Sequence, residues 1–330
     1  MKNLFPLISV LVPVFNAEKT LPKCLDSLEK QENHSFEVVL VDDCSSDSSF
    51  QLMKAFLNRN AGRQPIKLFR QPNNMGVAVT RNTCLSLSSG DYICWLDADD
   101  VLCPDLISTL IQNVRLSHAD IIGYEWFLSF DKSRRYMRQE PFSTSDEAVT
   151  NFMLGVTRWN LWIYLVKRSL YIDYGISFLP GHDMGEDLLV MTKLFVKASH
   201  IAFVPKPLYE YRMSNSDSMT KTYSDKHRCQ VEDNLNAMHC YLTEHGRSYL
   251  LKNWDNMKLF IKLPLLMSAH YSDYRKWYNW FPESNSAVMK NPKQSFRIKL
   301  LQWLAAKKFF FAIKCYYCLV YKLVYGVIYK

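Results

Sequence analysis

The chain has 330 residues, enough for one large α/β domain with a smaller appendage or for two modest domains. Hydrophobic residues make up 48% and charged residues 22%, proportions that exclude a wholly disordered chain. The formal net charge of +8 is unevenly spread, because no Asp or Glu occurs after Glu283 while lysines continue to the end. This basic excess indicates an anionic partner, either nucleic acid or an acidic membrane surface.

Short apolar runs and helical patterns alternate along the N-terminal part of the chain. The apolar runs predict buried strands at 7–13, 36–41, 66–70 and 92–96, the first of them ended by Pro13. Helically spaced apolar residues predict helices at 17–31, 49–60, 77–88 and 103–117. This alternation predicts an α/β fold with a mostly parallel sheet covered by helices on both faces.

The α/β character continues from residue 118 to about 215, with Arg134-Arg135 in a charged loop near a predicted hairpin. From about Tyr223 onward the pattern is helical. We therefore expect an α/β domain at 1–220 and a helical, basic and aromatic region at 221–330.

The nine cysteines are an odd number, and most stand singly in apolar or helical runs. Only Cys315 and Cys318 form a C-x-x-C pair, and no second pair follows to complete a zinc site. This usage favours a reducing compartment. Residues 1–13 lack a long apolar segment, so we expect no signal peptide and a cytoplasmic protein.

An acidic cluster, Asp97-Ala98-Asp99-Asp100, directly follows the fourth predicted strand. Side chains alternate along an extended segment, so Asp97 and Asp99 point the same way. Packed carboxylates repel each other unless a cation lies between them, and Mg²⁺ or Mn²⁺ prefers oxygen ligands completed by substrate phosphates. The alternative is that Asp99 or Asp100 only caps the helix near Pro104.

Two other polar segments are expected at the same edge of the sheet. Phe15-Asn16 follows the first predicted strand, and Asp42-Asp43 follows the second. Ligands of parallel α/β sheets bind beyond the carboxyl ends of the strands, so these segments and the acidic cluster should converge. Asp42 and Asp43 have an alternative role as caps of the helix that starts near Ser49.

Taken together, these segments resemble glycosyltransferase family 2, which has the GT-A fold, a Rossmann-like mixed sheet flanked by helices. The resemblance is carried by residues 8–16, 41–47, 73–76, 81–82, 90–93 and 96–100. Gly185-Glu186-Asp187 resembles the family's Glu-Asp motif, and residues 207–212, with Ser216 and Ser218 behind them, resemble the segment that follows it. The resemblance implies nucleotide-sugar binding at about 1–125, an acceptor part at about 126–220 and a helical C-terminal extension.

The resemblance also implies roles by position. Pro13, Phe15 and Asp43 would line the nucleobase pocket with Asp42 beside it, Arg81 would contact the base or diphosphate, and Asp97 would face the ribose and diphosphate. Asp99 would hold Mn²⁺ or Mg²⁺. The alternative interpretation of Arg81 is a solvated residue on the surface of a helix. Many members have Gly where this chain has Cys44, a departure that narrows the freedom of the turn.

Members of the family invert the anomeric configuration, which implies that an acceptor hydroxyl displaces the nucleoside diphosphate in one in-line step. The hydroxyl must lose its proton to a positioned carboxylate. We assign this general base to Asp187, with Glu186 as neighbour or alternate. Adjacent carboxylates point to different sides on most backbones, so only one should reach the hydroxyl. Both residues also suit a helix N-terminus.

Three residues that precede the Glu-Asp motif in the sequence are candidates for contact with the acceptor. Trp159 and Trp162 offer aromatic faces that stack on sugars, with core packing as the alternative. His182 lies in the loop just before the base. The expected donor is a nucleotide sugar, most often a UDP-sugar in this family. The expected acceptor is a saccharide or lipid-linked saccharide in surface polysaccharide or glycan synthesis.

The stretch 299–330 mixes aromatic residues with regularly placed lysines. A central lysine in a spanning helix costs about 2.5–3.5 kcal/mol, and Lys314 and Lys322 interrupt the apolar run. We therefore expect peripheral attachment to the acidic inner face of the cell membrane rather than a span. The alternative is a helix pair packed on the catalytic domain.

Two other classes of protein compete with a glycosyltransferase. A nucleotidyltransferase usually carries a Gly-rich signature with a lysine near the first strand, which Val14-Phe15-Asn16 lacks. A non-catalytic nucleotide-binding or nucleic-acid-binding protein should place basic residues near aromatic stacking positions on the main domain. Here they concentrate in the tail, so we expect no nucleic-acid partner.

Overall fold

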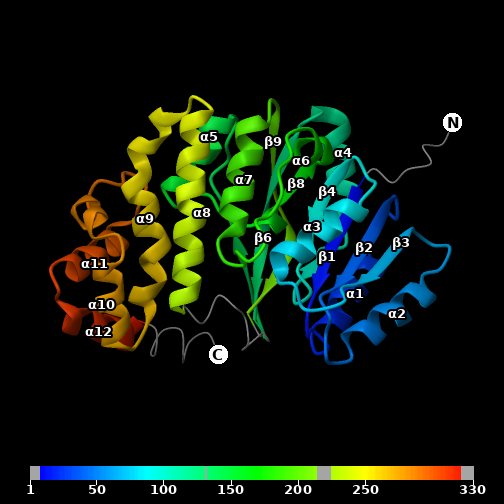
Figure 1. Ribbon diagram of the computed structural model, residues 1–330, viewed down its shortest axis with the longest axis horizontal. Coiled ribbons are helices and arrows are strands. Elements are labelled where there is room, and N and C mark those ends of the chain that lie inside the picture. Colours follow the sequence, from blue (N-terminus) through cyan, green and yellow to red (C-terminus); the bar gives the residue numbers. More distant parts are fainter. Residues whose placement is uncertain (1–7, 131, 214–223, 321–330) are drawn as a thin grey trace. The chain divides into compact units, whose positions relative to one another are not determined.

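The computed structural model describes residues 8–130, 132–213 and 224–320. The chain divides into two compact units, Met1–Ser145 with Trp159–Glu244, and Asp146–Arg158 with His245–Lys330. The first unit is an α/β domain and the second is helical (Figure 1).

The first unit is built on one mixed sheet in the order β3-β2-β1-β4-β8-β6-β9-β5, with β7 paired to β6. The strands are β1 (Ile8–Val14), β2 (Phe36–Asp42), β3 (Ile66–Arg70), β4 (Tyr92–Trp95), β5 (Val101–Leu102), β6 (Ile121–Ser129), β7 (Arg134–Met137), β8 (Tyr164–Lys167) and β9 (Ile201–Arg212). Strand β8 is antiparallel to both β4 and β6, while β9 is parallel to β6. The carboxyl ends of β1, β2, β4, β6 and β9 therefore lie at one edge of the sheet.

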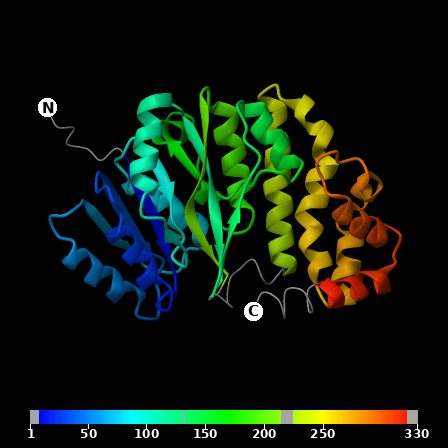
Figure 2. The ribbon, with the colours of Figure 1, turned by 180° about the vertical axis from the view of Figure 1, so that it is seen from behind.

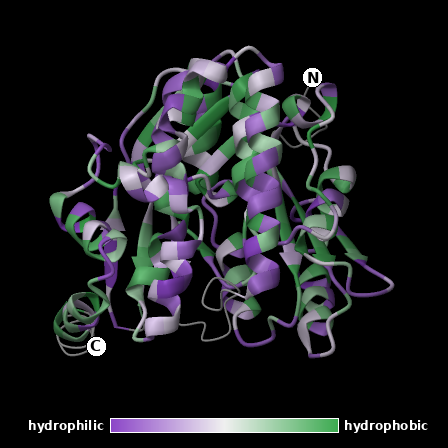
Figure 3. Ribbon diagram, turned by 60° about the vertical axis from the view of Figure 1, so that its left-hand side comes forward, coloured by the Kyte–Doolittle hydropathy of each residue, from purple (hydrophilic) through white to green (hydrophobic). Residues whose placement is uncertain are grey.

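Helices cover this sheet as the alternating pattern predicts. They are α1 (Leu21–Glu29), α2 (Ser49–Arg59), α3 (Val77–Leu87), α4 (Leu106–Ser117), η1 (Leu161–Ile163), α6 (Arg168–Asp173), α7 (Glu186–Lys197) and α8 (Asp225–Glu244). The strands are mostly hydrophobic, whereas the helices mix hydrophobic with hydrophilic residues (Figure 3). Helix α1 begins at Leu21 rather than Ala17, since Pro22 suits a first helical turn.

Strand β1 contains Pro13 and ends at Val14, whereas the sequence predicted that Pro13 would end it. The register explains the difference. Strand β4 pairs with β1 only as far as Leu11, and the N–H of Leu96 still bonds to the Leu11 carbonyl. Position 13 faces the same side as Leu11, beyond the end of β4, so the ladder loses nothing at a residue without an N–H.

The second unit contains α5 (Ser145–Met153), α9 (Trp254–Lys262), α10 (Tyr271–Asn279), α11 (Phe296–Ala306) and α12 (Phe310–Tyr317), with the short helices η3 (Ser248–Asn253), η4 (Leu263–Met267) and η5 (Pro282–Ala287). At its centre, the buried ammonium of Lys262 donates to the carbonyl of Trp280 (2.8 Å) and to Oδ1 of Asn285 (2.6 Å). Neutral acceptors thus satisfy a lysine that burial would otherwise penalise.

The division between the units falls after α8, whereas the predicted boundary near residue 220 precedes that helix. Helix α8 packs on α7 within the first unit, with Val231 close to Gly185 and the ammonium of Lys193 over the ring of Tyr241. The helical pattern after residue 223 is confirmed over the described residues, but helical periodicity alone does not tell which neighbour a helix packs against.

Candidate active site

The loops that follow β1 and β2 are tied together at the carboxyl edge of the sheet. The N–H of Asn16 donates to Oγ of Ser45 (2.9 Å), and Oδ1 of Asn16 accepts from the N–H of Ser46 (2.9 Å). Asn16 has a φ of 46°, a left-handed conformation that asparagine tolerates. Phe15, next to it, is 49% exposed, so its ring is available to a ligand at this edge, whereas Pro13 is buried in β1.

Asp42 is fully buried at the end of β2. Its carboxylate accepts from the N–H of Ser45 (3.2 Å) and pairs with Nε of Arg70 (3.1 Å). The guanidinium of Arg70 in turn donates to the Ser45 carbonyl (2.8 Å). Asp42 therefore fixes the turn after β2 and does not cap α2, whose first N–H, that of Ser49, donates to Asp47.

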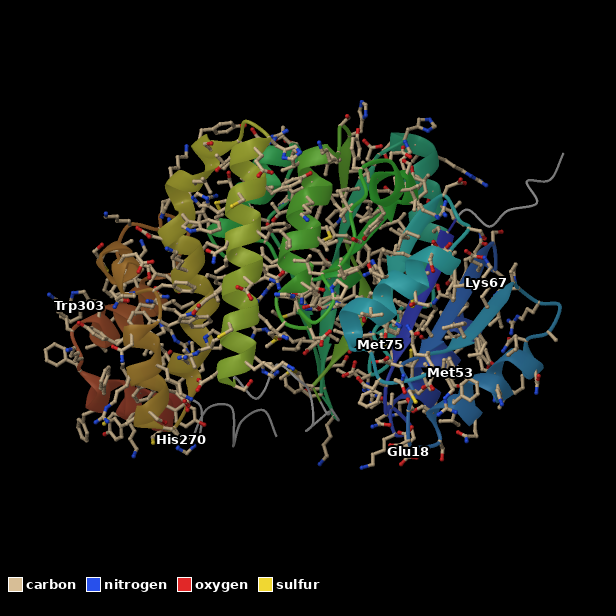
Figure 4. The ribbon with its side chains drawn as sticks, in the orientation of Figure 1. Glu18, Met53, Lys67, Met75, His270 and Trp303 are labelled. Atoms are coloured by element: carbon tan, nitrogen blue, oxygen red, sulfur yellow. The ribbon has the colours of Figure 1, made fainter. Side chains whose placement is uncertain are left out.

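Asp43 holds the turn that leads into α3, where Figure 4 labels Met75. Its carboxylate accepts from the N–H groups of Met75 (2.8 Å) and Gly76 (3.0 Å). On the other side, Oδ1 of Asp183 accepts from the N–H of Ala78 (3.0 Å). A Cβ at Gly76 would lie 2.6 Å from Oδ2 of Asp183, and φ there is 85°, so this close approach requires glycine.

Cys44 occupies a left-handed position with φ of 59°, where a side chain strains the backbone. The departure noted in the sequence therefore has a structural cost. We expect Cys44→Gly to raise the free energy of unfolding by about 1 kcal/mol, measured by chemical denaturation. Cys44→Ala is the matched control, since it removes the thiol but keeps the strain. Equal stability of the two variants would contradict this explanation.

Arg81, on α3, is the centre of the site and is only 6% exposed. Its Nη1 donates to Oδ1 of Asp187 (2.7 Å) and to Oε1 of Glu186, and its Nη2 donates to Oδ1 of Asp97 (3.5 Å). Burial alone would lower the pKa of Arg81, but the charges of the three carboxylates outweigh burial and raise it. Arg81 is therefore not the solvated helix residue of the alternative interpretation.

Glu186 and Asp187 begin α7, as predicted, but both reach the same nitrogen of Arg81. The expectation that adjacent carboxylates point to different sides is wrong here, because both side chains turn toward the one buried cation. Burial and the charge of Asp187 raise the pKa of Glu186, with Arg81 acting in the opposite direction. The second oxygen of Asp187 accepts from the N–H of Leu161 at 3.4 Å.

Each member of the acidic cluster has a different environment. The side chain of Asp97 is 29% exposed; burial raises its pKa, Arg81 lowers it, and Asp99 adds to the increase. Asp99 is half-buried. Asp100 is buried and accepts from the hydroxyl of Tyr209 (2.8 Å) and the N–H of Arg212 (2.8 Å), so it joins the cluster to β9.

The cluster fits part of a metal site. Among the described residues, no three His, Cys, Asp or Glu side chains form a group able to hold a metal ion. Asp97 and Asp99 nevertheless offer oxygen donors at a partly exposed position. Mg²⁺ typically binds one or two carboxylates and completes its coordination with substrate phosphates and water. The residues present are consistent with a cation that binds together with a diphosphate.

The three acceptor candidates lie in different surroundings. Trp162 is 5% exposed and stacks on the rings of Tyr209 (4.5 Å) and Tyr211 (5.4 Å), which favours core packing. Nε2 of His182 lies 3.2 Å from the carboxylate of Asp233 on α8. Trp159 is half-buried. Of the two tryptophans, only Trp159 retains substantial exposed surface for a sugar.

The sequence did not indicate that Asn82 and Asp183 fix the loop before α7 onto α3. The amide of Asn82 donates to the Phe178 carbonyl (2.8 Å) and accepts from the Phe178 N–H (2.9 Å). Asp183 bonds to the start of α3, as described above. These contacts join segments that are far apart in the chain, so local sequence patterns do not reveal them. The one signal in the sequence was that Asn82 directly follows the motif residue Arg81.

Comparison with known proteins places this geometry in a family. The family model for glycosyl transferase family 2 matches residues 9–186. Glycosyltransferase GlyG of Streptococcus pneumoniae serotype 4 is 29% identical over 232 residues, which cover 66% of this chain and 74% of that protein.

Solved structures show the fold. A Staphylococcus aureus TarS fragment in complex with UDP-GlcNAc superposes with a TM-score of 0.67 at 18% identity, covering 94% of this chain and 90% of that one. A Pyrobaculum calidifontis mannosyltransferase with GDP-Man and Mn²⁺ gives a TM-score of 0.55 at 15% identity, covering 93% and 87%. The sheet and flanking helices thus form a GT-A fold with a helical C-terminal region. The chain belongs to glycosyl transferase family 2 and is a glycosyltransferase.

Proposed function

We propose that this glycosyltransferase transfers a sugar from a UDP-sugar to a hydroxyl of a saccharide or lipid-linked saccharide, with inversion, in surface polysaccharide or glycan synthesis. The observation that carries the proposal is the Arg81 cluster. One guanidinium joins the Glu-Asp pair of α7 to Asp97 at the carboxyl edge of the sheet. The predicted proton acceptor and the predicted diphosphate site are therefore neighbours, as a displacement between acceptor and donor requires.

The donor is proposed to bind along the loops after β1 and β2. Phe15 is exposed for stacking on a base, and Asp43 fixes the turn before α3. TarS is named a poly(ribitol-phosphate) β-N-acetylglucosaminyltransferase and has a structure with UDP-GlcNAc, which supports the proposal of a UDP-sugar donor.

In this mechanism Asp187 accepts the proton of the attacking hydroxyl. Arg81 and the Leu161 N–H hold its two oxygens, so the carboxylate is oriented before the acceptor arrives. A bound Mn²⁺ or Mg²⁺ would stabilise the charge of the leaving diphosphate. Asp97 and Asp99 are the residues that would hold it.

The direct test is incubation of the full chain with a panel of nucleotide sugars and Mn²⁺ or Mg²⁺. We expect release of UDP from one UDP-sugar, faster with acceptor, and an inverted anomeric configuration by NMR. Release of pyrophosphate from a nucleoside triphosphate would support the nucleotidyltransferase alternative. Nucleotide binding without turnover of any sugar would support the non-catalytic alternative.

Metal removal provides a second prediction. Chelation by EDTA should lower turnover by at least about tenfold, with recovery on adding Mn²⁺. Asp99→Asn should raise the Mn²⁺ concentration needed for half-maximal turnover. The control is Asp91→Asn, an exposed carboxylate at the amino end of β4. Full turnover in EDTA would contradict a metal-dependent reaction.

We also propose that the second unit attaches the enzyme to the acidic inner face of a membrane. No helix among the described residues has the length and apolarity to span a bilayer. Helices α11 and α12 form a pair that exposes Phe296 (71%) and Phe311 (73%) beside basic residues such as Lys299. Lys322 and the rest of 321–330 lie outside the described residues, as do Ser216 and Ser218.

Point substitutions test this attachment better than truncation, because α11 and α12 bury Leu301, Ala305 and Ile313 in their own unit. The double variant F296A/F311A should lose most of its co-sedimentation with phosphatidylglycerol vesicles. Leu116→Ala, at an exposed position of the first unit, is the matched control. Equal binding to neutral phosphatidylcholine vesicles would contradict the electrostatic part of the proposal.

A further inference from the structure

A pocket of about 570 Å³ opens in the first unit, and none of the predicted donor residues lines it. It is lined by Lys23, Val101, Ser129, Phe130, Lys132, Ser133, Arg134, Glu210 and Arg212. These residues come from α1, from β5, from the hairpin between β6 and β7, and from the end of β9. Its volume lies within the range of small-molecule sites.

The pocket adjoins the acidic cluster. Val101 directly follows Asp100, and the N–H of Arg212 donates to the Asp100 carboxylate (2.8 Å). Ser129 and Arg212 end β6 and β9, whose carboxyl ends share the edge where β4 leads into Asp97. In Figure 2, β6 and β9 are the long green strands that run side by side to the bottom of the sheet.

Four cationic side chains and one carboxylate line the pocket. Glu210 pairs with Arg134 (3.1 Å) and accepts from Oγ of Ser129 (3.2 Å). Among the described residues, the remaining cations, Lys23, Lys132 and Arg212, form no ion pair. An unbalanced group of lysine and arginine side chains in a concave site is suited to an anion with several oxygens.

We propose that this pocket binds a phosphate of the acceptor, so that the acceptor is a phosphate-bearing saccharide or polyol. The inference rests on the proposed function, because it assumes that the donor occupies the loops after β1 and β2. Those loops and the pocket lie on either side of the acidic cluster in the strand order. A phosphate held at Lys23, Lys132 and Arg212 would place a nearby hydroxyl of the same molecule beside the cluster.

The phosphate can belong to a polyol-phosphate chain or to the diphosphate of a lipid-linked saccharide, and two probes separate these sources. One is a fluorescent glycerol-phosphate oligomer, and the other is a sugar diphosphate with a short prenyl chain. A phosphate-free polyglycerol of the same length is the neutral reference. The full chain should bind one phosphate probe at least about tenfold tighter than the neutral probe, and more weakly as salt increases.

Substitutions test whether the phosphate probe binds in this pocket. The double variant K23Q/K132Q should lower the affinity for the phosphate probe by about tenfold. Glu210→Gln should strengthen it, since this change removes the anion and frees Arg134. Arg135→Gln is the matched control, because Arg135 is exposed on the opposite face of β7 from Arg134 and does not line the pocket. It should leave the affinity unchanged.

The inference would be overturned by equal binding of phosphate and neutral probes, or by equal effects of K23Q/K132Q and Arg135→Gln. A loss of UDP affinity in K23Q/K132Q, measured by calorimetry, would also overturn it by assigning the pocket to the donor. Failure of the proposed function is a separate outcome, in which the unmodified protein turns over no nucleotide sugar.

Discussion

Replacing Arg81 by methionine should lower the free energy of unfolding of the first unit by about 3–5 kcal/mol at neutral pH. Methionine retains much of the apolar bulk that packs between Trp95 and Phe178. It removes, however, the one cation that Glu186, Asp187 and Asp97 share. Carboxylates that are buried without a counter-charge account for most of the expected loss.

The loss should depend on pH with a defined sign. Burial and the charge of Asp187 already raise the pKa of Glu186 to about 8 against the opposing effect of Arg81, so the loss of Arg81 should raise it further. The folded variant then binds more protons than the unfolded chain. This contribution of Glu186 to stability is complete below about pH 4 and is lost as pH rises through its raised pKa. The deficit relative to the unmodified protein should therefore be larger near about pH 9 than near about pH 6, because Glu186 titrates at about 8 in the unmodified protein and higher in the variant.

Urea denaturation of both proteins at several pH values measures this deficit. Adding Glu186→Gln to the Arg81→Met protein should recover part of the stability, because one uncompensated carboxylate disappears. Arg81→Lys is the conservative control. It keeps the positive charge but lacks the branched guanidinium that contacts Glu186, Asp187 and Asp97 together. A deficit that is independent of pH would mean that Arg81 acts through packing rather than charge.

Asp187→Asn should reduce turnover by about 10²–10⁴-fold, the range that general-base catalysis contributes. The amide keeps the shape of the side chain, and its oxygen can still accept from Arg81, but it cannot take a proton. UDP affinity should change by no more than a few-fold, because the predicted donor loops lie on other elements. Steady-state kinetics and calorimetry on the same preparations measure both quantities.

Glu186→Gln is the matched variant, since Glu186 shares the same nitrogen of Arg81. If Asp187 is the base, Glu186→Gln should retain most of the turnover and alter mainly its pH dependence. The reverse result, with a larger loss in Glu186→Gln, would assign the proton transfer to Glu186. Normal turnover in Asp187→Asn would remove that residue from the mechanism.

Local periodicity was sufficient to predict strands β1 to β4, helices α1 to α4 and the position of the acidic cluster at a strand end. These features depend on residues close in sequence, where apolar spacing and turn residues act directly on the backbone. The parallel arrangement then requires Phe15, Asp43 and Asp97 to approach one edge. Most of the candidate site was therefore predictable from the sequence.

Other features depended on contacts between distant segments. Nothing near Arg81 in the sequence indicates that its guanidinium is buried against Glu186 and Asp187 on α7. An aromatic run likewise does not show that Trp162 packs against Tyr209 in the core. The grouping of α8 with the first unit also follows from packing against α7.

The sequence by itself determined the family, the α/β alternation and the chemical character of the site, because motif residues and periodicity are local properties. Only the tertiary structure decided how the charges are paired. Arg81 pairs with three carboxylates, and Asp100 accepts from the Tyr209 hydroxyl and the backbone N–H of Arg212. Of the four cationic side chains that line the pocket beside the acidic cluster, only Arg134 forms an ion pair among the described residues. The reason is that electrostatic pairing depends on distance and burial in space, which a linear chain does not specify.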